Sequence, residues 1–224
     1  MKAILLVGIV VVAILDWLAV WRQWRRVGYF AKPFTIVLLF TWLASQTSFK
    51  GATLWFALGL ILSLAGDIFL MLPPRFFMPG LACFALVHLA YFSGFISPPQ
   101  SIGSWIAMVV IVCLGIPATL LMKKIIQSQL DRGLKKMAGP TLFYALLINL
   151  MIFSAILTFF RTDWTFDTAI LVGFGACLFY ISDLINAWIR FVTPLRTGRV
   201  TVMVSYHLGQ ILIISGVVGH FNNF

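Results

Sequence analysis

Two aspartates stand inside apolar stretches of a chain that has only six acidic residues, all of them Asp. Asp67 lies within SLAGDIFLML and Asp183 within LFYISDLINAW. A carboxylate in hydrocarbon costs from ~3 to more than 10 kcal/mol, so it is retained where it is paired, protonated or used. Two such carboxyl groups can transfer protons, either during hydrolysis or during proton-coupled transport. We therefore take Asp67 and Asp183 as the candidate catalytic residues.

The composition around these residues is that of a membrane protein. Of the 224 residues, 62% are hydrophobic and 10% are charged, against ~25% charged in soluble domains. The formal charge of +10 would suggest a nucleic-acid partner in a soluble protein. Here the basic residues occupy short breaks between apolar runs, a pattern that sets orientation in a bilayer, so no nucleic-acid partner is expected. The sequence predicts a single polytopic membrane domain over residues 1–224.

The predicted fold class is an all-α integral membrane protein with eight transmembrane helices. The predicted spans cover residues 3–21, 33–48, 52–72, 76–96, 102–122, 139–160, 167–189 and 199–219. Most of them reach the ~20 residues that a bilayer crossing needs. Prolines mark several of the expected ends, among them Lys32-Pro33 and Gly139-Pro140. The connector 122–138 is long and basic, and we expect an interfacial helix or an extension of a neighbouring helix there.

The distribution of basic residues predicts how these helices cross the membrane. With eight spans, 13 of the 16 Lys and Arg residues fall on one side, and Lys2, Lys50 and Arg161 fall on the other. The positive side generally faces the cytoplasm, so both termini are expected on the opposite side. Asp67 and Asp183 then lie about 10–12 Å from the cytoplasmic edge, at ~1.5 Å per helical residue.

The two aspartates also occupy related sequence frames. GLILSLAGDIFLML (residues 59–72) aligns without gaps to GACLFYISDLINAW (residues 175–188), which pairs Asp67 with Asp183. His88 and His207, respectively, follow one helix later. The spans that carry the aspartates are four apart, so the sequence predicts a parallel 4+4 internal repeat. Such a repeat would direct both carboxyl groups into one cavity.

Polar residues in the neighbouring spans are candidates for binding or positioning a substrate. They are Lys32, His88, Tyr91, Tyr144, Asn149, Asn186, Tyr206, His207 and Gln210. Tyr91 follows His88 by three residues and Gln210 follows Tyr206 by four, so each pair shares one helix face. A lone His or Asn in a membrane helix more commonly forms a structural hydrogen bond within its own helix or between helices, and this structural alternative stays open for the two histidines and the Asn149 amide.

Other residues that could do chemistry receive a structural interpretation. Asp16 lies beside Trp17 and near three arginines, so we expect it at the membrane interface, paired with Arg22 or Arg25. The three cysteines are expected to pack as small apolar side chains: Cys83, Cys113 and Cys177. No local spacing of His, Cys or acidic residues is typical of a metal site, so no metal or other cofactor is expected.

Five segments resemble the YhhN family of membrane proteins, which includes the lysoplasmalogenases. They are KP (32–33), SLAGD (63–67), FALVHLAY (84–91), GACLFYISD (175–183) and SYHLGQILI (205–213), in that order along nearly the whole chain. The resemblance implies a multi-pass protein of a bacterial inner membrane with a lysophospholipid substrate. It implies hydrolysis of the vinyl ether bond of a lysoplasmalogen, which yields a fatty aldehyde and glycerophosphoethanolamine or glycerophosphocholine. A related lysolipid or ether lipid stays open as an alternative substrate.

The implied reaction needs an acid and a base. A vinyl ether is cleaved by protonation of its β-carbon, which leaves an oxocarbenium ion that water captures as a hemiacetal. The hemiacetal then collapses to aldehyde and alcohol. One carboxyl group must supply the proton while a carboxylate stabilises the cation and activates water, as in two-carboxylate glycosidases. The sequence does not assign the two roles, and we start from Asp67 as the acid and Asp183 as the base. Lys32 is the candidate for binding the headgroup phosphate.

Two other classes of function would use the same aspartates. Intramembrane aspartyl proteases also carry two membrane aspartates, but their G-x-G-D motif is replaced here by Leu64-Ala65-Gly66-Asp67, and the two aspartates are four spans apart. A non-enzymatic lipid carrier or a proton-coupled transporter would also need buried Asp and His residues. Release of aldehyde from lysoplasmalogen by the purified protein separates the three alternatives.

Overall fold

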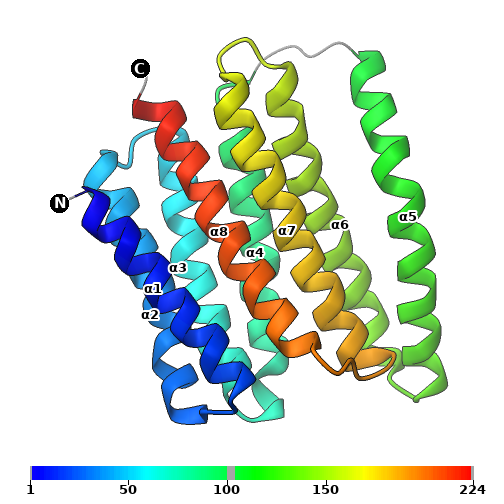
Figure 1. Cartoon of the computed structure of the whole chain (residues 1–224). Helices are drawn as coiled ribbons and strands as arrows, with labels where there is room; N and C mark the ends of the chain where they lie inside the picture. The colour runs from blue at the N-terminus through cyan, green and yellow to red at the C-terminus, as the bar shows by residue number, and fades with distance from the viewer. Residues whose placement is uncertain (1, 100–103, 223–224) are drawn as a thin grey trace.

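The computed structural model describes residues 2–99 and 104–222, and every regular element within them is helical. The α-helices are α1 Lys2–Trp21, α2 Arg25–Gln46, α3 Ala52–Met71, α4 Phe77–Phe95, α5 Ser104–Asp131, α6 Lys135–Leu157, α7 Phe166–Phe191 and α8 Gly198–Asn222. Two short 3-10 helices, η1 Pro74–Phe76 and η2 Thr158–Phe160, precede α4 and follow α6. Figure 1 shows the helices side by side in one bundle, with α5 at its edge.

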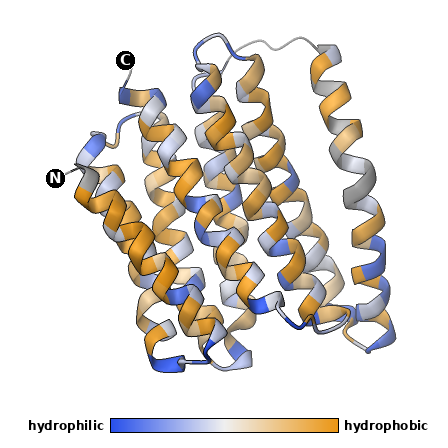
Figure 2. Ribbon diagram, in the orientation of Figure 1, coloured by the Kyte–Doolittle hydropathy of each residue, from blue (hydrophilic) through white to orange (hydrophobic). Residues whose placement is uncertain are grey.

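The surface of this bundle is suited to lipid. Within the described residues, seven helices are long and apolar enough to cross a membrane. Hydrophobic residues occupy most of the length of the helices (Figure 2), and large apolar side chains such as Ile4, Phe30 and Phe143 are exposed. A soluble monomer rarely exposes continuous apolar surface of this extent. The protein is therefore an integral, multi-pass membrane protein.

Each predicted span overlaps a helix, and the clearest differences lie at two prolines. α2 begins at Arg25 and α6 at Lys135, so Pro33 and Pro140 lie inside helices and the expectation that they open them is wrong. Proline removes one backbone hydrogen bond, and membrane helices tolerate this loss because neighbouring groups satisfy the freed carbonyl. The start of the fifth predicted span, residues 102–103, lies outside the described residues.

The basic connector 122–138 is a helix extension, one of its two expected forms. α5 continues through most of it to Asp131, and α6 begins at Lys135. Gly133 in the turn between them has a φ of +72°, a conformation that glycine adopts without strain. The two helices therefore pack antiparallel through a short turn.

Glycines let the helices that carry the aspartates approach their neighbours closely. Between α7 and α8, a Cβ atom on Gly175 would lie 2.9 Å from the carbonyl oxygen of Gly209, and one on Gly209 would lie 2.8 Å from the amide nitrogen of Phe179. Between α3 and α4, a Cβ atom on Gly66 would lie 2.8 Å from the ring of Phe84. Small residues at helix crossings are how membrane helices commonly come into backbone contact. These crossings fix the positions of α3 and α7.

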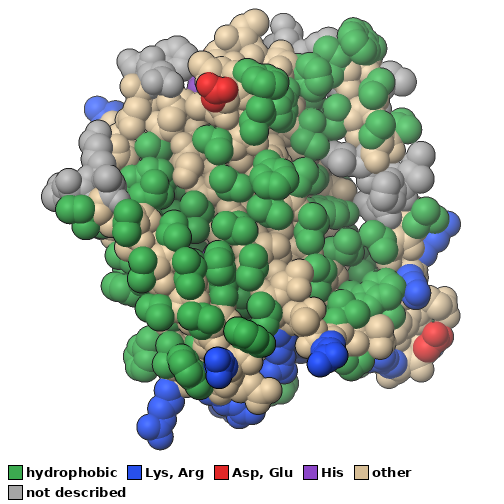
Figure 3. Space-filling view, viewed as in Figure 1, with side chains coloured by type: hydrophobic (Ala, Val, Ile, Leu, Met, Phe, Trp, Pro, Cys, Tyr) green, Lys and Arg blue, Asp and Glu red, His purple; other side chains and the backbone are tan. Residues whose placement is uncertain are grey.

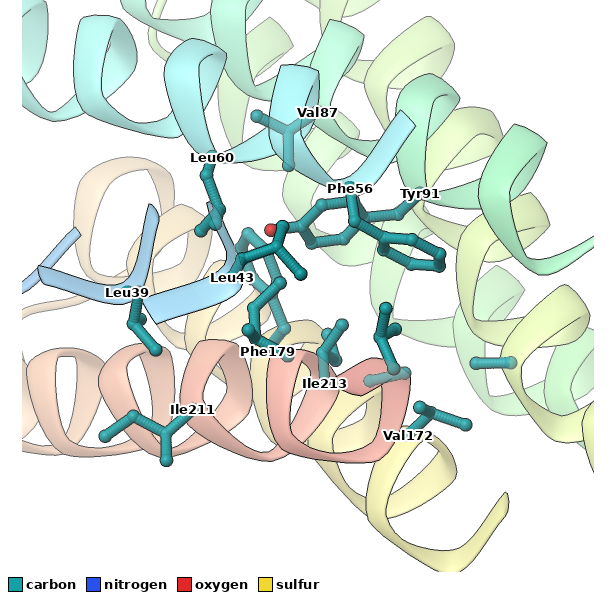
Figure 4. Close-up of a cluster of buried hydrophobic side chains, with 14 of the residues drawn as sticks. Leu39, Leu43, Phe56, Leu60, Val87, Tyr91, Val172, Phe179, Ile211 and Ile213 are labelled. Atoms are coloured by element: carbon teal, nitrogen blue, oxygen red, sulfur yellow. The ribbon is translucent and has the colours of Figure 1, made fainter. Parts of the chain in front are cut away.

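An aromatic core fills the centre of the bundle. Phe56 of α3, Tyr91 of α4 and Phe179 of α7 are fully buried, and Figure 4 shows them beside Ile213 of α8. The ring centroids of Phe56 and Tyr91 are 5.5 Å apart, and those of Tyr91 and Phe179 are 6.5 Å apart. Aromatic pairs stabilise each other in this range. Phe56 precedes Asp67 on α3 by about three helical turns, so it lies farther along the bundle axis than that aspartate. The aromatic core therefore closes the bundle on that side of the aspartates.

A buried arginine ties together the loops at one end of the bundle. Arg161 donates to both carboxylate oxygens of Asp163, at 3.0 and 2.8 Å, and to the carbonyl oxygen of Pro98, at 2.9 Å. Partial burial acts to raise the pKa of Asp163, but the hydrogen bonds and the charge of Arg161 outweigh it and hold that pKa below its ordinary value. Trp164 stacks on His220, with ring centroids 3.9 Å apart. These contacts join the loops before α5 and α7 to the end of α8.

Most Lys and Arg side chains in view gather at the opposite end of the bundle (Figure 3), where α1, α3, α5 and α7 terminate. We call this the basic end. α1 begins and α8 ends at the other end of the bundle, as Figure 1 shows. The assignment of the basic end to the cytoplasm and the 4+4 repeat stay predictions.

Candidate active site

A cavity of about 230 Å³ lies toward the basic end, and side chains from α2, α3, α4, α6, α7 and α8 line it. Asp67 reaches it from α3 and Asp183 reaches it from α7. The structure therefore brings together the two aspartates that the sequence singled out. Four further predicted site residues line the same cavity: Lys32, Tyr144, Asn186 and Tyr206.

Asp67 is held by two side chains from other helices. Its side chain is fully buried, and its Oδ1 lies 2.9 Å from Nζ of Lys32, on α2. The hydroxyl group of Tyr206, on α8, donates a hydrogen bond to Oδ2 at 2.9 Å. The ammonium group also lies 5.5 Å from the centroid of the Tyr206 ring, within the range of a cation–π contact. Asp67 is thus a charge-paired carboxylate, each of whose oxygens has a partner.

Asp183 has a different set of partners. The hydroxyl group of Tyr144, on α6, donates to its Oδ2, and Nε2 of His88, on α4, lies 3.0 Å from the same oxygen. Nε2 of His88 also lies 3.0 Å from the Tyr144 hydroxyl, so the three groups form a closed triangle. His88 is fully buried, whereas the Asp183 side chain keeps 15% of its surface exposed. Asp183 therefore faces the cavity, held by His88, which is buried, and by Tyr144, which lines the same cavity.

Tyr91 and Gln210 lie behind the site, where they support it. The Tyr91 hydroxyl donates to Oε1 of Gln210 at 2.6 Å, and Nε2 of Gln210 donates to Oγ of Ser63 at 2.9 Å. All three side chains are buried. A Cβ atom on Gly59 would lie 2.1 Å from the Tyr91 ring, so only glycine fits there. Because Ser63 precedes Asp67 by one helical turn, this chain of hydrogen bonds fixes the α3 turn that carries the aspartate.

Two predicted site residues lie elsewhere. Asn149 donates to the carbonyl oxygen of Ala145 on its own helix, at 2.7 Å, and lines a separate groove of about 1330 Å³ between α5 and α6. Nδ1 of His207 accepts a hydrogen bond from the indole N–H of Trp17 at 3.1 Å and lies 3.9 Å from Oδ2 of Asp16. For Asn149 and His207 the structural alternative therefore describes the observed contacts, and neither lines the aspartate cavity.

The expectation for Asp16 is wrong. Its side chain is 1% exposed and faces His207 of α8, where pairing with Arg22 or Arg25 at the membrane interface had been expected. The physical reason is the rotation of α1 about its axis, which turns this residue toward α8 instead of toward the loop arginines. The apolar sequence of α1 offers little contrast between its faces from which that rotation could be predicted.

Sequence reasoning missed several residues of the site, among them Ser63 and Arg190. Arg190 is not among the predicted site residues, yet it lines the aspartate cavity. A signal was present in the spacing, because Asp183, Asn186 and Arg190 follow one another at i, i+3 and i+7 and so share one helix face. Ser63 precedes Asp67 by four residues and gave a weaker signal of the same kind.

No group of three or more His, Cys, Asp or Glu side chains within the described residues could hold a metal ion. The chemistry that the cavity itself offers is proton transfer. One carboxylate stands against an ammonium group, and a second carboxyl group stands against an imidazole and a phenol. Apolar side chains such as Leu70, Leu81 and Phe84 line the same cavity.

Comparison with known proteins gives a consistent result. The YhhN family matches residues 27–217 of the chain. A mouse protein named lysoplasmalogenase TMEM86B is 28% identical over 184 residues, which cover 82% of this chain and 71% of the relative. Human lysoplasmalogenase TMEM86A is 30% identical, and a Dictyostelium discoideum lysoplasmalogenase homolog is 28% identical; the matches cover 71% and 73% of this chain and 63% of each relative. No solved structure matches the chain. With a family match over most of its length, the chain belongs to the YhhN family.

Proposed function

We propose that this protein is a lysoplasmalogenase that uses Asp67 and Asp183 to hydrolyse the vinyl ether bond of a lysophospholipid. The observation that carries the proposal is the placement of two membrane carboxyl groups, with different partners, on one cavity. The mouse and human relatives, which match most of the chain, bear the name lysoplasmalogenase. At this modest identity, the relatives support the class of reaction but not its mechanism. The argument for the mechanism comes from the cavity.

The cavity suits the reacting part of a lipid. Its volume of about 230 Å³ is below the ~300–1,000 Å³ of typical small-molecule sites, so it holds a glycerol and a vinyl ether but not a whole lysolipid. The hydrocarbon chain then stays between helices and in the surrounding bilayer. Leu70, Leu81 and Phe84 provide an apolar lining for the alkenyl carbons.

The partners of the two aspartates divide their roles. Asp67 is fully buried and engaged through both oxygens by Lys32 and Tyr206, which holds it as a fixed carboxylate. The contacts of Asp183 to Tyr144 and His88 both go to Oδ2, and the side chain is partly exposed to the cavity. We therefore assign Asp183 as the acid and Asp67 as the stabilising carboxylate, the reverse of the starting assignment from the sequence.

In the first step, protonated Asp183 gives its proton to the β-carbon of the vinyl ether. The carbon–carbon π electrons form the new C–H bond, and a lone pair of the ether oxygen stabilises the oxocarbenium ion that results. The fixed carboxylate of Asp67 faces this positive charge, as the second carboxylate does in a glycosidase. His88 and Tyr144 hold the carboxylate that Asp183 has become.

In the second step, water adds to the oxocarbenium carbon and passes a proton to Asp183, which restores the acid. The hemiacetal then collapses: its C–O bond to the glycerol oxygen breaks, its hydroxyl proton passes to that oxygen, and a fatty aldehyde and the glycerophospho-headgroup are released, with one water consumed overall. Asp183 thus acts first as acid and then as base, which returns it to its starting protonation state after each turnover.

Aldehyde release by the purified protein in detergent micelles tests the proposal. Alkenyl lysophosphoethanolamine should be cleaved, and the saturated alkyl analogue should bind and inhibit without being cleaved, since it has no β-carbon that can accept a proton. Turnover should slow in heavy water if proton transfer to carbon limits the rate. Absence of turnover without an ion gradient would favour the transporter alternative, and cleavage of a membrane peptide would favour the protease.

We further place the protein in a bacterial inner membrane with its basic end toward the cytoplasm. The support for the orientation is the excess of Lys and Arg in alternate loops. A reporter that is active only in the cytoplasm should give no signal when fused to the C-terminus, and strong signal there would reverse the orientation.

A further inference from the structure

A phosphate in the cavity needs a cation, and the described lining residues include two, Lys32 and Arg190. Lys32 was the candidate from the sequence. Its side chain is 12% exposed and its ammonium group lies 2.9 Å from Asp67, so its charge is already balanced within the protein. A phosphate that took this ammonium group would leave a fully buried carboxylate without its counter-charge, which is costly.

Arg190 is free of this conflict. It is exposed at the end of α7, and its guanidinium carbon lies 3.5 Å from the centroid of the Phe77 ring of α4, which also lines the cavity. Stacking on an aromatic face fixes the plane of a guanidinium group while its N–H donors stay available at the edge. Those donors form a planar fork that matches two oxygens of a phosphate.

The position of Arg190 relative to the acid fits one substrate orientation. Arg190 follows Asp183 by seven residues and Asn186 lies between them on the same helix face. The rise along α7 from acid to guanidinium-bearing residue is about 10 Å. In a lysoplasmalogen the glycerol backbone separates the phosphate from the vinyl ether, and the flexible arginine side chain can shorten the remaining distance.

We propose that Arg190, stacked on Phe77, binds the headgroup phosphate of the lysolipid at the mouth of the cavity, with Asn186 beside the glycerol. This subsite rests on the proposed function for its substrate class. It makes the enzyme specific for lipids that carry a phosphate, and it places that phosphate at the basic end, where the headgroups of the leaflet lie.

The test compares substrates with and without the phosphate. For Arg190→Gln, kcat/KM for alkenyl lysophosphoethanolamine should fall about 10- to 100-fold, as expected for lost hydrogen bonds to a charged group. For alkenyl glycerol, which has the same vinyl ether and no phosphate, kcat/KM should stay within about threefold. Arg190→Lys should recover part of the loss, because it restores the charge without the fork.

Arg75→Gln is the matched control. Its guanidinium carbon lies 4.9 Å from the Phe76 ring near the same end of the bundle, but Arg75 does not line the cavity. This variant should leave both substrates unaffected. Equal losses on both substrates in Arg190→Gln, or no loss on either, would overturn the phosphate subsite.

A binding measurement separates failure of this inference from failure of the proposed reaction. Saturated alkyl lysophosphoethanolamine and alkyl glycerol are titrated into the purified protein in micelles, without turnover. Arg190→Gln should weaken binding of the phosphate-bearing lipid alone. If the wild type binds both lipids but cleaves neither alkenyl substrate, the proposed reaction is wrong. The phosphate subsite is then still tested by whether Arg190→Gln weakens binding of the phosphate-bearing lipid alone.

Discussion

Replacement of Lys32 by methionine should lower the free energy of unfolding by about 3–5 kcal/mol, the usual cost of removing one partner from a buried ion pair. The magnitude follows from burial, since the Asp67 side chain is 0% exposed and Lys32 is 12% exposed at a separation of 2.9 Å. Methionine keeps much of the aliphatic length of lysine, so packing changes little. The carboxylate of Asp67 is left with the Tyr206 hydroxyl and no counter-charge.

A double variant distinguishes lost pairing from lost packing. Asp67→Asn alone should cost less than Lys32→Met, because Lys32 borders the cavity and water can reach its ammonium group. In the combination of both changes no buried charge remains. Its loss of stability should therefore be smaller than the sum of the two single losses, by at least ~1.5 kcal/mol, within the range seen for coupled neighbours.

The assay is denaturant unfolding in mixed micelles, followed by tryptophan fluorescence. Lys124→Met is the control, because it makes the same substitution at an exposed lysine. The Lys124 ammonium group lies 4.7 Å from the centroid of the Trp188 ring. This control change should cost no more than about 1 kcal/mol, the value of an exposed cation–π contact. Additivity of the Lys32 and Asp67 changes to within ~0.5 kcal/mol would refute the ion pair as the stabilising contact.

Three further predictions concern activity and packing. Asp67→Asn and Asp183→Asn should each remove nearly all aldehyde release in folded protein. The double variant should be hardly worse than either, because residues that act as a unit are non-additive. If the activity of Asp183→Asn is within about threefold of wild type, Asp183 is not the acid. Gly209→Val should destabilise the bundle, since even a Cβ atom would lie 2.8 Å from an α7 backbone nitrogen, whereas Gly8→Val meets nothing within 4 Å and should be neutral in thermal unfolding. Arg161→Gln should lower the thermal midpoint without changing kcat, because the contacts of Arg161 join loops at the end of the bundle opposite the cavity. A loss of kcat together with the lower thermal midpoint would contradict this and show that the two ends are coupled.

The elements of this fold could be predicted because membrane helices are marked by length and apolarity alone. The pairing of Asp67 with Asp183 on one cavity could also be anticipated, since both stand at similar depth in related sequence frames. The start of α2 could not, because the residues before Pro33 mix the basic side chains of Arg25, Arg26 and Lys32 with apolar ones, and they continue the helix beyond the apolar run.

The rotation of each helix about its axis was the main information that the sequence lacked. In a bilayer, lipid-facing and core-facing residues are both apolar, so the 3.6-residue period that orients a soluble helix is weak. Asp16 was therefore placed at the interface although it faces His207, and Asn149 was placed at the site although it faces the groove between α5 and α6. Lys32 was the predicted ligand of the headgroup phosphate, because the sequence could not reveal that its ammonium group pairs with Asp67.

The contacts of the two aspartates have the relation that a 4+4 repeat would produce. Asp67 of α3 takes partners from α2 and α8. Asp183 of α7 takes partners from α6 and α4. Displacement by four helices relates α2 to α6, α3 to α7 and α4 to α8, so it converts the first set of helices into the second. A 4+4 repeat would supply two equivalent carboxyl positions on one cavity, which only their partner residues would distinguish.

The decisive difference between the two positions is the residue supplied by α2 or α6, which is Lys32 for Asp67 and Tyr144 for Asp183. In the proposed mechanism, the ammonium group fixes one carboxylate, whereas the phenol leaves the other able to take up and release a proton. Tyr144→Lys should therefore give both carboxylates a counter-charge and reduce aldehyde release to the level of Asp183→Asn. Tyr144→Phe, which removes only the hydroxyl group, should retain more activity. The thermal midpoint of each variant shows whether it is folded. Turnover by a folded Tyr144→Lys protein close to that of the wild type would mean that counter-charge does not decide which aspartate is the acid.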